Sequence, residues 1–407
     1  IVSVDLVNAA ALAVFMITIL TRRLPLRLPF ALPMFIAIVG SVLAMSNAVS
    51  VMASVLALIK DAYLYLWFAA MVTVLEPRGT MRNFRLAWVW TAIGVSLVVY
   101  VQAAMSGELS LRQLLVTNRE RSVGTMTNSN MFADYMMFSM FVLLSLVNQV
   151  RWRFLVPAML LVLSALITTK SNGGLVSLMS GLAVWGVATA WRRGIPWQRL
   201  AGTIVLGIAV VATGVWLHGE FGIGDSLVRE VTAHSYVGRM SHSGAARGQI
   251  WHRLEETYSH SPLGIGPKNS SEQTVSIGER ERPDSFRSKE AHNDYLAFAV
   301  ERGPLGLLGL LLGTWQAIAM VVRGRRRLDL RFGGVVAGRA LWTAFLGALV
   351  ASSVHSLVIE KLHFRHFWLF LAMATAACLE AVPAAAPVPR RAPTLSRQAN
   401  GLSALRG

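Results

Sequence analysis

Apolar runs of membrane-spanning length recur along almost the whole chain. They cover residues 1–20, 28–47, 51–75, 85–105, 130–148, 154–169, 174–191, 199–217, 291–322, 336–354 and 366–382. A helix needs about twenty mostly apolar residues to cross a bilayer, so this pattern predicts about eleven transmembrane helices. Gly303 and Pro304 interrupt the run at 291–322 and predict a break or kink there. The sequence therefore predicts an all-α polytopic membrane protein.

The connections between these runs alternate in charge. One set is rich in arginine, while the other is uncharged, as at 47–50, or mixed in sign, as at 218–290. The arginines of the basic set are Arg22, Arg23, Arg27, Arg78, Arg82, Arg85, Arg151, Arg153, Arg192, Arg193, Arg199, Arg323, Arg325, Arg326, Arg327, Arg331, Arg390 and Arg391. The positive-inside rule places this set in the cytoplasm and the other set outside. With Ile1 then outside and the C-terminus inside, we expect a missing upstream helix and about twelve spans in the full-length chain.

Composition and charge agree with this class. Hydrophobic residues make up 54% of the chain and charged residues 14%, which excludes a globular domain with one core. The net charge is +17, but the excess lies in the basic loops and does not indicate nucleic-acid binding. The single cysteine, Cys378, lies in the last apolar run, so an intramolecular disulfide framework is ruled out.

The chain divides into four predicted segments. Residues 1–217 hold eight transmembrane helices, and 218–290 form an outer, mainly helical segment. Residues 291–382 hold the C-terminal transmembrane helices, and 383–407 form a disordered cytoplasmic tail with several Pro, Ala and Arg residues.

The outer segment contains a predicted amphipathic helix at about 246–260. Its apolar stripe consists of Ile250, Trp251, Leu254 and Tyr258. Such a helix can lie on the bilayer. Arg247 shares the face of this stripe, where it either reaches a lipid phosphate or clamps a substrate phosphate with its guanidinium fork.

The stretch AHNDYLAFAVERG, residues 291–303, turns the chain back into the membrane with His292 at the turning point. A helix N-terminus favours anions and opposes protonation of an imidazole. A neutral histidine is therefore expected at this position. It belongs either to a functional site or to a simple re-entry turn.

Lys60 and Asp61 lie in the middle of the third apolar run. Ionisable side chains at this depth are costly on a lipid-facing surface, so they usually pair or mark a pathway. We expect these two residues to form a structural pair inside the bundle.

Polar and basic side chains gather on the predicted outer face. They are Arg112, Arg119, Arg121, Asn128 and Asn130 before the fifth run, Lys170 in the turn 170–174, and His355, Glu360, Lys361, His363 and Arg365 in the last loop. Positive charge is disfavoured on this face, so its presence suggests an anionic ligand outside. Zinc motifs, a phosphate-binding P-loop and paired outer aspartates are absent from the sequence, and we expect no metal and no cofactor. The set suits binding a diphosphate and deprotonating a hydroxyl.

Three stretches resemble the consecutive motifs of the O-antigen ligase and polymerase superfamily. They are VGTMTNSNMFADYM at 123–136, GAARGQIWHRLEETYSHSPLGIGP at 244–267, and AHNDYLAFAVERGPLGLLG at 291–309. Their shared features are Gly-Thr followed by Asn-x-Asn, an Arg-x-x-x-Trp helix followed by Pro-x-Gly-x-Gly, and His-Asn followed by Glu-x-Gly-x-x-Gly. The resemblance extends over most of residues 50–380.

The resemblance implies a GT-C-type helical bundle in the bacterial inner membrane with an active site facing the periplasm. It implies metal-independent transfer of a glycan from undecaprenyl diphosphate, for ligases to the lipid A core of lipopolysaccharide. By motif, His292 would be the base or an orienting residue for the acceptor hydroxyl. The diphosphate ligands would be Arg247, Arg121, Lys170 and Arg119, with Asn128, Asn130, Asn293 and Glu301 in supporting positions. Asn172 stands where many members have arginine, and Lys170 then supplies a point charge instead of a fork.

The sequence is also compatible with other functions. An O-antigen polymerase or a protein O-oligosaccharyltransferase would use the same donor, and these motifs do not read the acceptor. A transporter of an anionic lipid-linked substrate would instead place ionisable residues along a midplane path. The polar groups gather at one face, which favours surface chemistry over transport.

Overall fold

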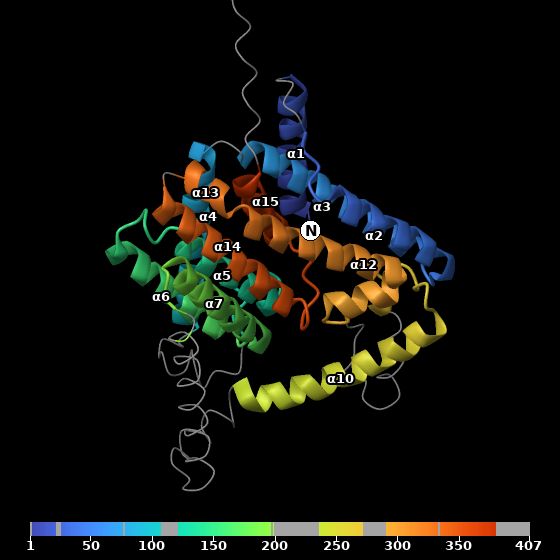
Figure 1. The fold of residues 1–407 in the computed structure, drawn as a ribbon. Coiled ribbons are helices and arrows are strands. Elements are labelled where there is room, and N and C mark those ends of the chain that lie inside the picture. The colour runs from blue at the N-terminus through green and yellow to red at the C-terminus, as the bar shows by residue number, and fades with distance from the viewer. Residues whose placement is uncertain are drawn as a thin grey trace, which may run out of the picture.

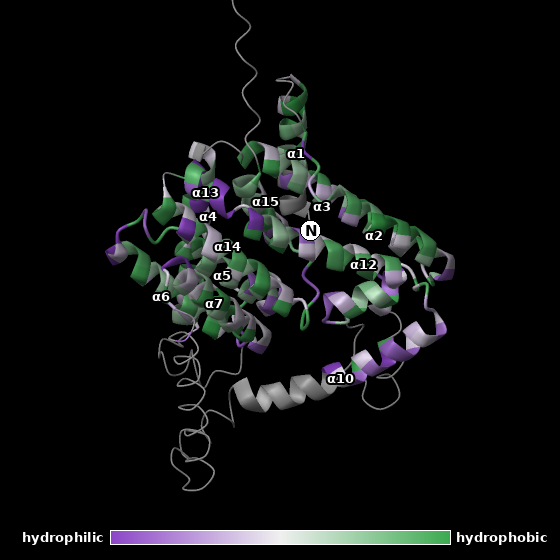
Figure 2. Cartoon of the chain, viewed as in Figure 1, coloured by the Kyte–Doolittle hydropathy of each residue, from purple (hydrophilic) through white to green (hydrophobic). Residues whose placement is uncertain are grey.

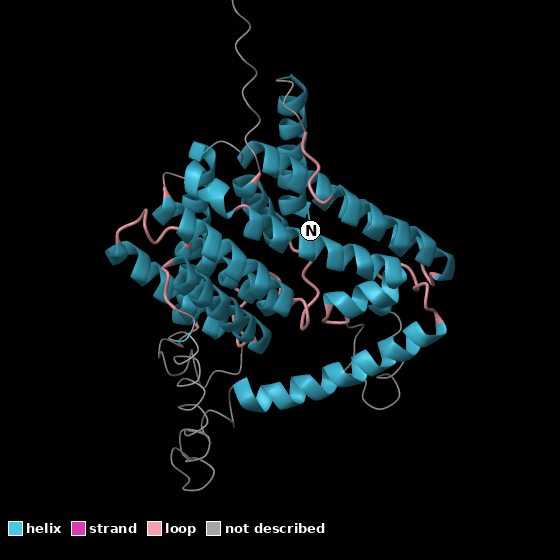
Figure 3. Ribbon diagram, viewed as in Figure 1, coloured by secondary structure: helices cyan, strands magenta, loops and turns pink. Residues whose placement is uncertain are grey.

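A computed structural model describes residues 2–21, 26–75, 78–106, 121–196, 198, 236–271, 290–332 and 334–379. Within these ranges the chain forms helices and no strand, as Figure 1 and Figure 3 show. The predicted all-α membrane fold is therefore confirmed. The predicted span 199–217 and the tail 383–407 lie outside the described residues, as does much of the outer segment.

The helices follow the predicted apolar runs closely. They are α1 (Val2–Thr21), α2 (Ala31–Ala44), α3 (Val51–Leu75), α4 (Arg78–Met105), α5 (Ser129–Leu144), α6 (Trp152–Thr168), α7 (Asn172–Arg192), α10 (Tyr236–His260), α12 (Asp294–Arg323), α13 (Arg325–Arg331), α14 (Val335–His355) and α15 (Arg365–Cys378), with a short 3₁₀ turn at Met45–Asn47. Among the described helices, α3, α4, α7, α12 and α14 are long and apolar enough to cross a membrane. The shorter apolar helices α1, α2, α5 and α6 complete the bundle.

Helix α5 forms the centre of the bundle. Its side chains are buried from Phe132 to Leu144, and it packs against α4, α6, α7 and α14. Phe138 stacks on Phe370 of α15 with 4.5 Å between ring centroids. The apolar side chains that remain exposed lie on the outer sides of the surrounding helices, such as Phe35 of α2 at 63% exposure and Trp90 of α4 at 70%. This inside-out distribution suits a bundle whose solvent is lipid, and Figure 2 shows the hydrophobic outer helices.

Two helix pairs pack through glycines. A Cβ atom on Gly181 of α7 would lie 2.5 Å from the carbonyl oxygen of Gly347 on α14. A Cβ atom on Gly40 of α2 would lie 2.5 Å from the amide nitrogen of Gly306 on α12. Small residues let helix backbones approach closely inside membranes, where dispersion forces hold the pairs together.

Helix α12 bends at Gly303, as predicted. Gly303 has φ 66° and ψ −168°, which breaks the helix between Arg302 and Pro304. The left-handed conformation favours glycine, and a Cβ atom there would lie 2.4 Å from the carbonyl oxygen of Leu263. The first piece of α12 is therefore short and ends on the outer loops of the bundle.

Connections of the arginine-rich set contact one another at one end of the bundle. Connections of the other set contact one another at the opposite end. On the basic side, Arg192 donates to both carboxylate oxygens of Asp329 at 2.8 and 2.7 Å, joining the ends of α7 and α13. On the other side, the Asn269 side chain accepts from the Ser50 amide at 2.8 Å, joining the outer segment to the 47–50 turn. These contacts agree with the two-sided arrangement. The compartment that each side faces stays a prediction.

The contact between α7 and α14 yields a test with a matched control. Gly181→Leu should lower the apparent unfolding temperature of the purified protein because overpacking a close contact costs about 1–3 kcal/mol. Gly186→Leu, on the same helix, should have little effect because a Cβ atom there meets nothing within 4 Å. Thermal unfolding in detergent measures both, and equal destabilisation by the two changes would contradict glycine-mediated packing.

Candidate active site

The turn before α12 places His292 on the side of the bundle that the charge pattern predicts to face outside, which we call the outer side. His292 has φ 51°, a left-handed conformation that costs about 1 kcal/mol or more for a residue with a Cβ atom. Asn293 follows as the N-cap, and its side-chain oxygen accepts from the amides of Tyr295 at 3.0 Å and Leu296 at 3.1 Å. The predicted supporting residue Asn293 therefore shapes the turn that presents the histidine.

Helix α10 holds the other side of this turn. The indole N–H of Trp251 donates to the carbonyl oxygen of Ala291 at 2.8 Å. Ile250 and Leu254 of α10 are buried with Ala291 and Val300 in a small apolar cluster. The amphipathic stripe predicted from the sequence thus packs against α12, and Figure 1 shows α10 running below the first half of α12.

Arg247 lies one helical turn before Trp251 and is half-buried. Burial lowers the pKa of its guanidinium. Because Trp251 is bonded to the residue next to His292, α10 brings Arg247 and His292 to the same region of the outer side. Residues that are distant in sequence therefore converge, as the predicted site requires.

A second basic region lies at the outer ends of α5, α6 and α7. The guanidinium of Arg121 donates to the Thr169 carbonyl at 2.9 Å and to the Asn130 side-chain oxygen at 2.5 Å. The same oxygen of Asn130 accepts from the Ser171 hydroxyl at 3.0 Å. Lys170 lies between these contacts, buried, with φ 51°.

The other residues predicted for the site make structural contacts of their own or lie outside the described residues. Asn128 caps α5, accepting from the Asn130 amide at 2.7 Å. Glu301 is buried and accepts from the Ser270 hydroxyl at 2.6 Å, which ties α12 to the outer segment. Arg119 lies outside the described residues.

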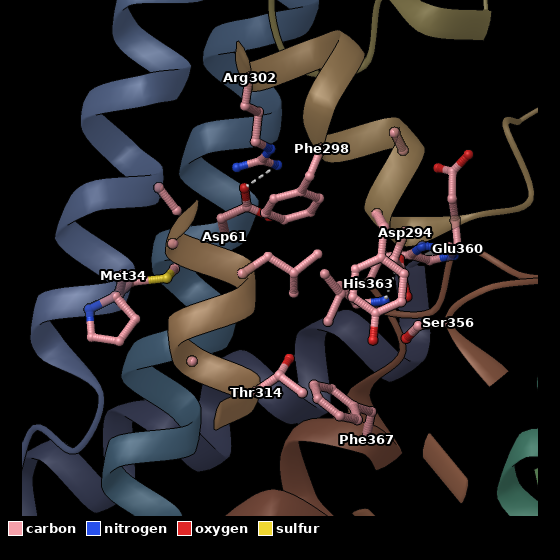
Figure 4. Close-up of a pocket in the computed structure, with 18 of the residues that line it drawn as sticks. Met34, Asp61, Asp294, Phe298, Arg302, Thr314, Ser356, Glu360, His363 and Phe367 are labelled. Carbon is pink, nitrogen blue, oxygen red and sulfur yellow. Dashed lines mark hydrogen bonds and ion pairs between the residues drawn. The ribbon is translucent and has the colours of Figure 1, made fainter. Parts of the chain in front are cut away.

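A cavity of about 380 Å³ opens between α2, α3, α12, α14 and the 356–364 loop. Its walls are mainly apolar, with Met34, Phe298 and Phe367 visible in Figure 4, although Asp61 and Arg302 also line them. Its outer end is polar and includes Lys268, Glu290, Glu301, Glu360 and His363. A lipid chain with a polar head matches this division into an apolar and a polar part.

Ion pairs and burial set the charge of the polar end. The Lys268 ammonium lies 3.0 Å from a Glu290 carboxylate oxygen. Burial, together with the nearby carboxylates of Glu301 and Glu290, raises the pKa of Glu360 to about 8. Burial lowers the pKa of His363 to about 4, although Glu290 acts in the opposite direction. Glu360 and His363 are therefore both largely neutral at pH 7.

The expected pairing of Lys60 with Asp61 is wrong. Asp61 instead lies 2.6 Å from the guanidinium of Arg302, across the cavity in Figure 4. Lys60 is exposed and also lines the cavity. Arg302 is also stacked on the Phe298 ring, with 4.4 Å between its central carbon and the ring centroid.

A buried ionic network behind the histidine turn was not foreseen. Asp134 of α5 is bonded to the Nδ1 atom of His355 at 2.6 Å and to the Nε2 atom of His366 at 2.9 Å. The Lys361 ammonium lies 3.8 Å from Asp134 and is bonded to the hydroxyl of Ser352. Asp134 lies within an apolar run, where an acidic residue usually has a partner, and this was the available signal.

This network reaches the turn through Asp294. The carboxylate of Asp294 accepts from the Lys361 amide at 3.0 Å, and its own amide donates to the Ser356 carbonyl at 2.8 Å. The 356–364 loop therefore anchors the first residue of α12, next to Asn293 and His292. Burying ionic groups in this way requires partners for each of them.

Comparison with known proteins gives one positive finding. No curated protein matches the chain. Residues 157–311 match the family model described as O-Antigen ligase, and this segment runs from α6 into the second half of α12. It includes Lys170, Arg247, His292, Asn293 and Glu301. Over this segment, which is less than half of the chain, the protein is similar to the O-antigen ligase family.

Proposed function

We propose that this protein transfers a glycan from undecaprenyl diphosphate to the lipid A core of lipopolysaccharide on the periplasmic face of the inner membrane. An O-antigen ligase-like function in general follows from the family match. The observation that carries the finer proposal is the docking of α10 on α12. The Trp251 hydrogen bond to Ala291 brings a half-buried arginine and a histidine to one side of the bundle.

His292 acts as the general base in the proposed reaction. Its neutral imidazole takes the proton of an acceptor sugar hydroxyl while that oxygen attacks the anomeric carbon of the donor glycan. A new glycosidic bond forms as the bond between the anomeric carbon and the diphosphate oxygen breaks. The electron pair of the broken bond leaves with the diphosphate.

Arg247 stabilises the negative charge that develops on the leaving diphosphate. A guanidinium binds two phosphate oxygens at once, and partial burial strengthens such an interaction. Arg121 and Lys170 are proposed as further ligands at the ends of α5 and α6, with Arg119 as a fourth. Asn130 orients the Arg121 fork through its 2.5 Å hydrogen bond.

The remaining predicted residues take supporting roles in this proposal. Asn293 caps α12 and fixes the backbone beside His292, while Asn128 caps α5 beside Asn130. Glu301 anchors Ser270 near the kink of α12. The apolar cavity next to these elements suits the hydrocarbon chain of a lipid-linked substrate.

Replacement of His292 by asparagine tests the base. Asparagine tolerates the left-handed conformation but cannot accept the proton as imidazole does, so transfer should fall by about 100- to 10,000-fold. The measurement is transfer by purified protein from an undecaprenyl diphosphate-linked glycan to lipid A core in EDTA. His252→Asn, an exposed histidine on α10, should keep full activity. Undiminished transfer by His292→Asn would contradict the role of His292 as the general base.

Replacement of Arg247 by lysine tests the diphosphate ligand. Lysine keeps the charge but loses the fork, so kcat/KM should fall by about 10- to 100-fold. Arg253→Lys on the same helix provides the control, since Arg253 faces Glu256 at 3.4 Å and its side chain is 40% exposed. Steady-state kinetics with varied donor measure both variants, and an equal effect of the two changes would contradict a specific role for Arg247.

A further inference from the structure

A second groove lies on the lipid-facing side of the bundle, away from the candidate active site. It has a volume of about 450 Å³ and runs between α4 and α6, with the end of α5 as its floor. The lining residues are Leu86, Val89, Trp90, Ile93, Leu143, Leu146, Val150, Arg153, Phe154, Leu155, Pro157, Ala158 and Leu161. Arg153 is the only charged residue among these lining residues. In Figure 1, α4 and α6 lie at the same edge of the bundle, and Figure 2 shows mainly hydrophobic residues along this edge.

The groove faces outward at membrane depth. Trp90 is 70% exposed and Phe154 is 61% exposed, although both are large apolar side chains. A hydrophobic groove on the perimeter of a membrane protein is filled by acyl chains because water cannot solvate it favourably. The volume lies in the range of ordinary ligand pockets.

Arginines mark one end of the groove. Arg151 and Arg153 lie at the start of α6, on the arginine-rich side of the bundle, and both are exposed. The Arg153 guanidinium is stacked on the Phe154 ring, with 5.0 Å between its central carbon and the ring centroid. This stacking holds the positive charge beside the apolar lining.

The elements that form the groove contain one acidic residue, Asp134 of α5, and this carboxylate is buried and already bonded to His355 and His366. Residues 78–105 of α4 and residues 135–168, which include α6, contain no Asp or Glu. Within the described part of the chain, Arg151 and Arg153 also form no ion pair. An occupant that balances these charges must therefore carry its own negative group.

The floor of the groove is rigidly built. The buried guanidinium of Arg85 donates to the Ser145 carbonyl at 3.2 Å and to the Gln149 side chain at 3.1 Å. These contacts fix the turn between α5 and α6 that carries Val150 and Arg151. The positions of Arg151 and Arg153 relative to the apolar lining of the groove are thus fixed.

We propose that this groove is a binding site for an anionic phospholipid of the adjacent leaflet. One acyl chain lies between Trp90 and Leu161, and the phosphodiester group binds Arg153 and Arg151. Basic sites between transmembrane helices select anionic head groups, with a contribution of about fivefold in affinity for each arginine. The site is separate from the proposed transfer reaction.

Binding of phosphatidylglycerol to the delipidated full chain in neutral detergent tests this proposal. Native mass spectrometry should show phosphatidylglycerol bound more tightly than phosphatidylcholine. The double variant Arg151→Ala, Arg153→Ala should weaken phosphatidylglycerol binding by about 25-fold and leave phosphatidylcholine binding nearly unchanged. The control Arg326→Ala removes an exposed arginine of α13 on the same side, outside the groove, and should change binding by less than about twofold.

A second variant tests the acyl-chain part of the site. Leu161→Trp places a larger side chain in the groove and should reduce retention of both lipids, while the unfolding temperature without lipid reports whether the fold is intact. The proposal is overturned if the double arginine variant binds phosphatidylglycerol like the wild type. Equal losses in the double variant and in Arg326→Ala would also overturn it, because the basic side as a whole would then bind the lipid.

Discussion

The buried carboxylate of Asp134 is the interaction on which the arrangement of the outer side depends. It joins α5 to α14 and α15 through His355 and His366, with Lys361 nearby. A buried charge without partners costs several kcal/mol, so removal of any one partner penalises the whole assembly. The network therefore holds the 356–364 loop against the centre of the bundle. That loop in turn holds Asp294, the first residue of α12.

The histidine turn is constrained from several directions at once. Asp294 anchors it to the 356–364 loop, Asn293 caps the helix that follows, and Trp251 holds Ala291 from α10. The glycine loop of the outer segment adds a further restraint at the kink of α12, where the amide of Ile265 donates to the Val300 carbonyl at 3.0 Å. Together these contacts offset the cost of the left-handed backbone at His292. A strained residue that is held this firmly is typical of functional sites, and it supports the choice of His292 as the base.

Sequence reasoning predicted the helices well because apolar length and charge alternation are strong, local signals. The kink at Gly303 and the apolar face of α10 also follow from local patterns, whereas a shared site for Arg247 and His292 was expected only from the family resemblance. The ion-pair partners of the buried acidic residues could not be predicted from these local patterns. Asp61 pairs with Arg302 from a helix far along the chain, and Asp134 gathers residues from α14, α15 and their connecting loop. Such pairings depend on which helices pack side by side, and hydrophobic periodicity does not encode this.

The central claim is that the outer side of this bundle transfers a glycan from a lipid diphosphate to lipid A core. The most direct measurement is product analysis after the wild-type protein is incubated with an undecaprenyl diphosphate-linked glycan and lipid A core in EDTA. We predict a product in which the glycan is joined to the core. Lengthening of the donor glycan with the core left unmodified would contradict the ligase assignment and favour a polymerase. The absence of any transfer would contradict the enzymatic account and favour transport.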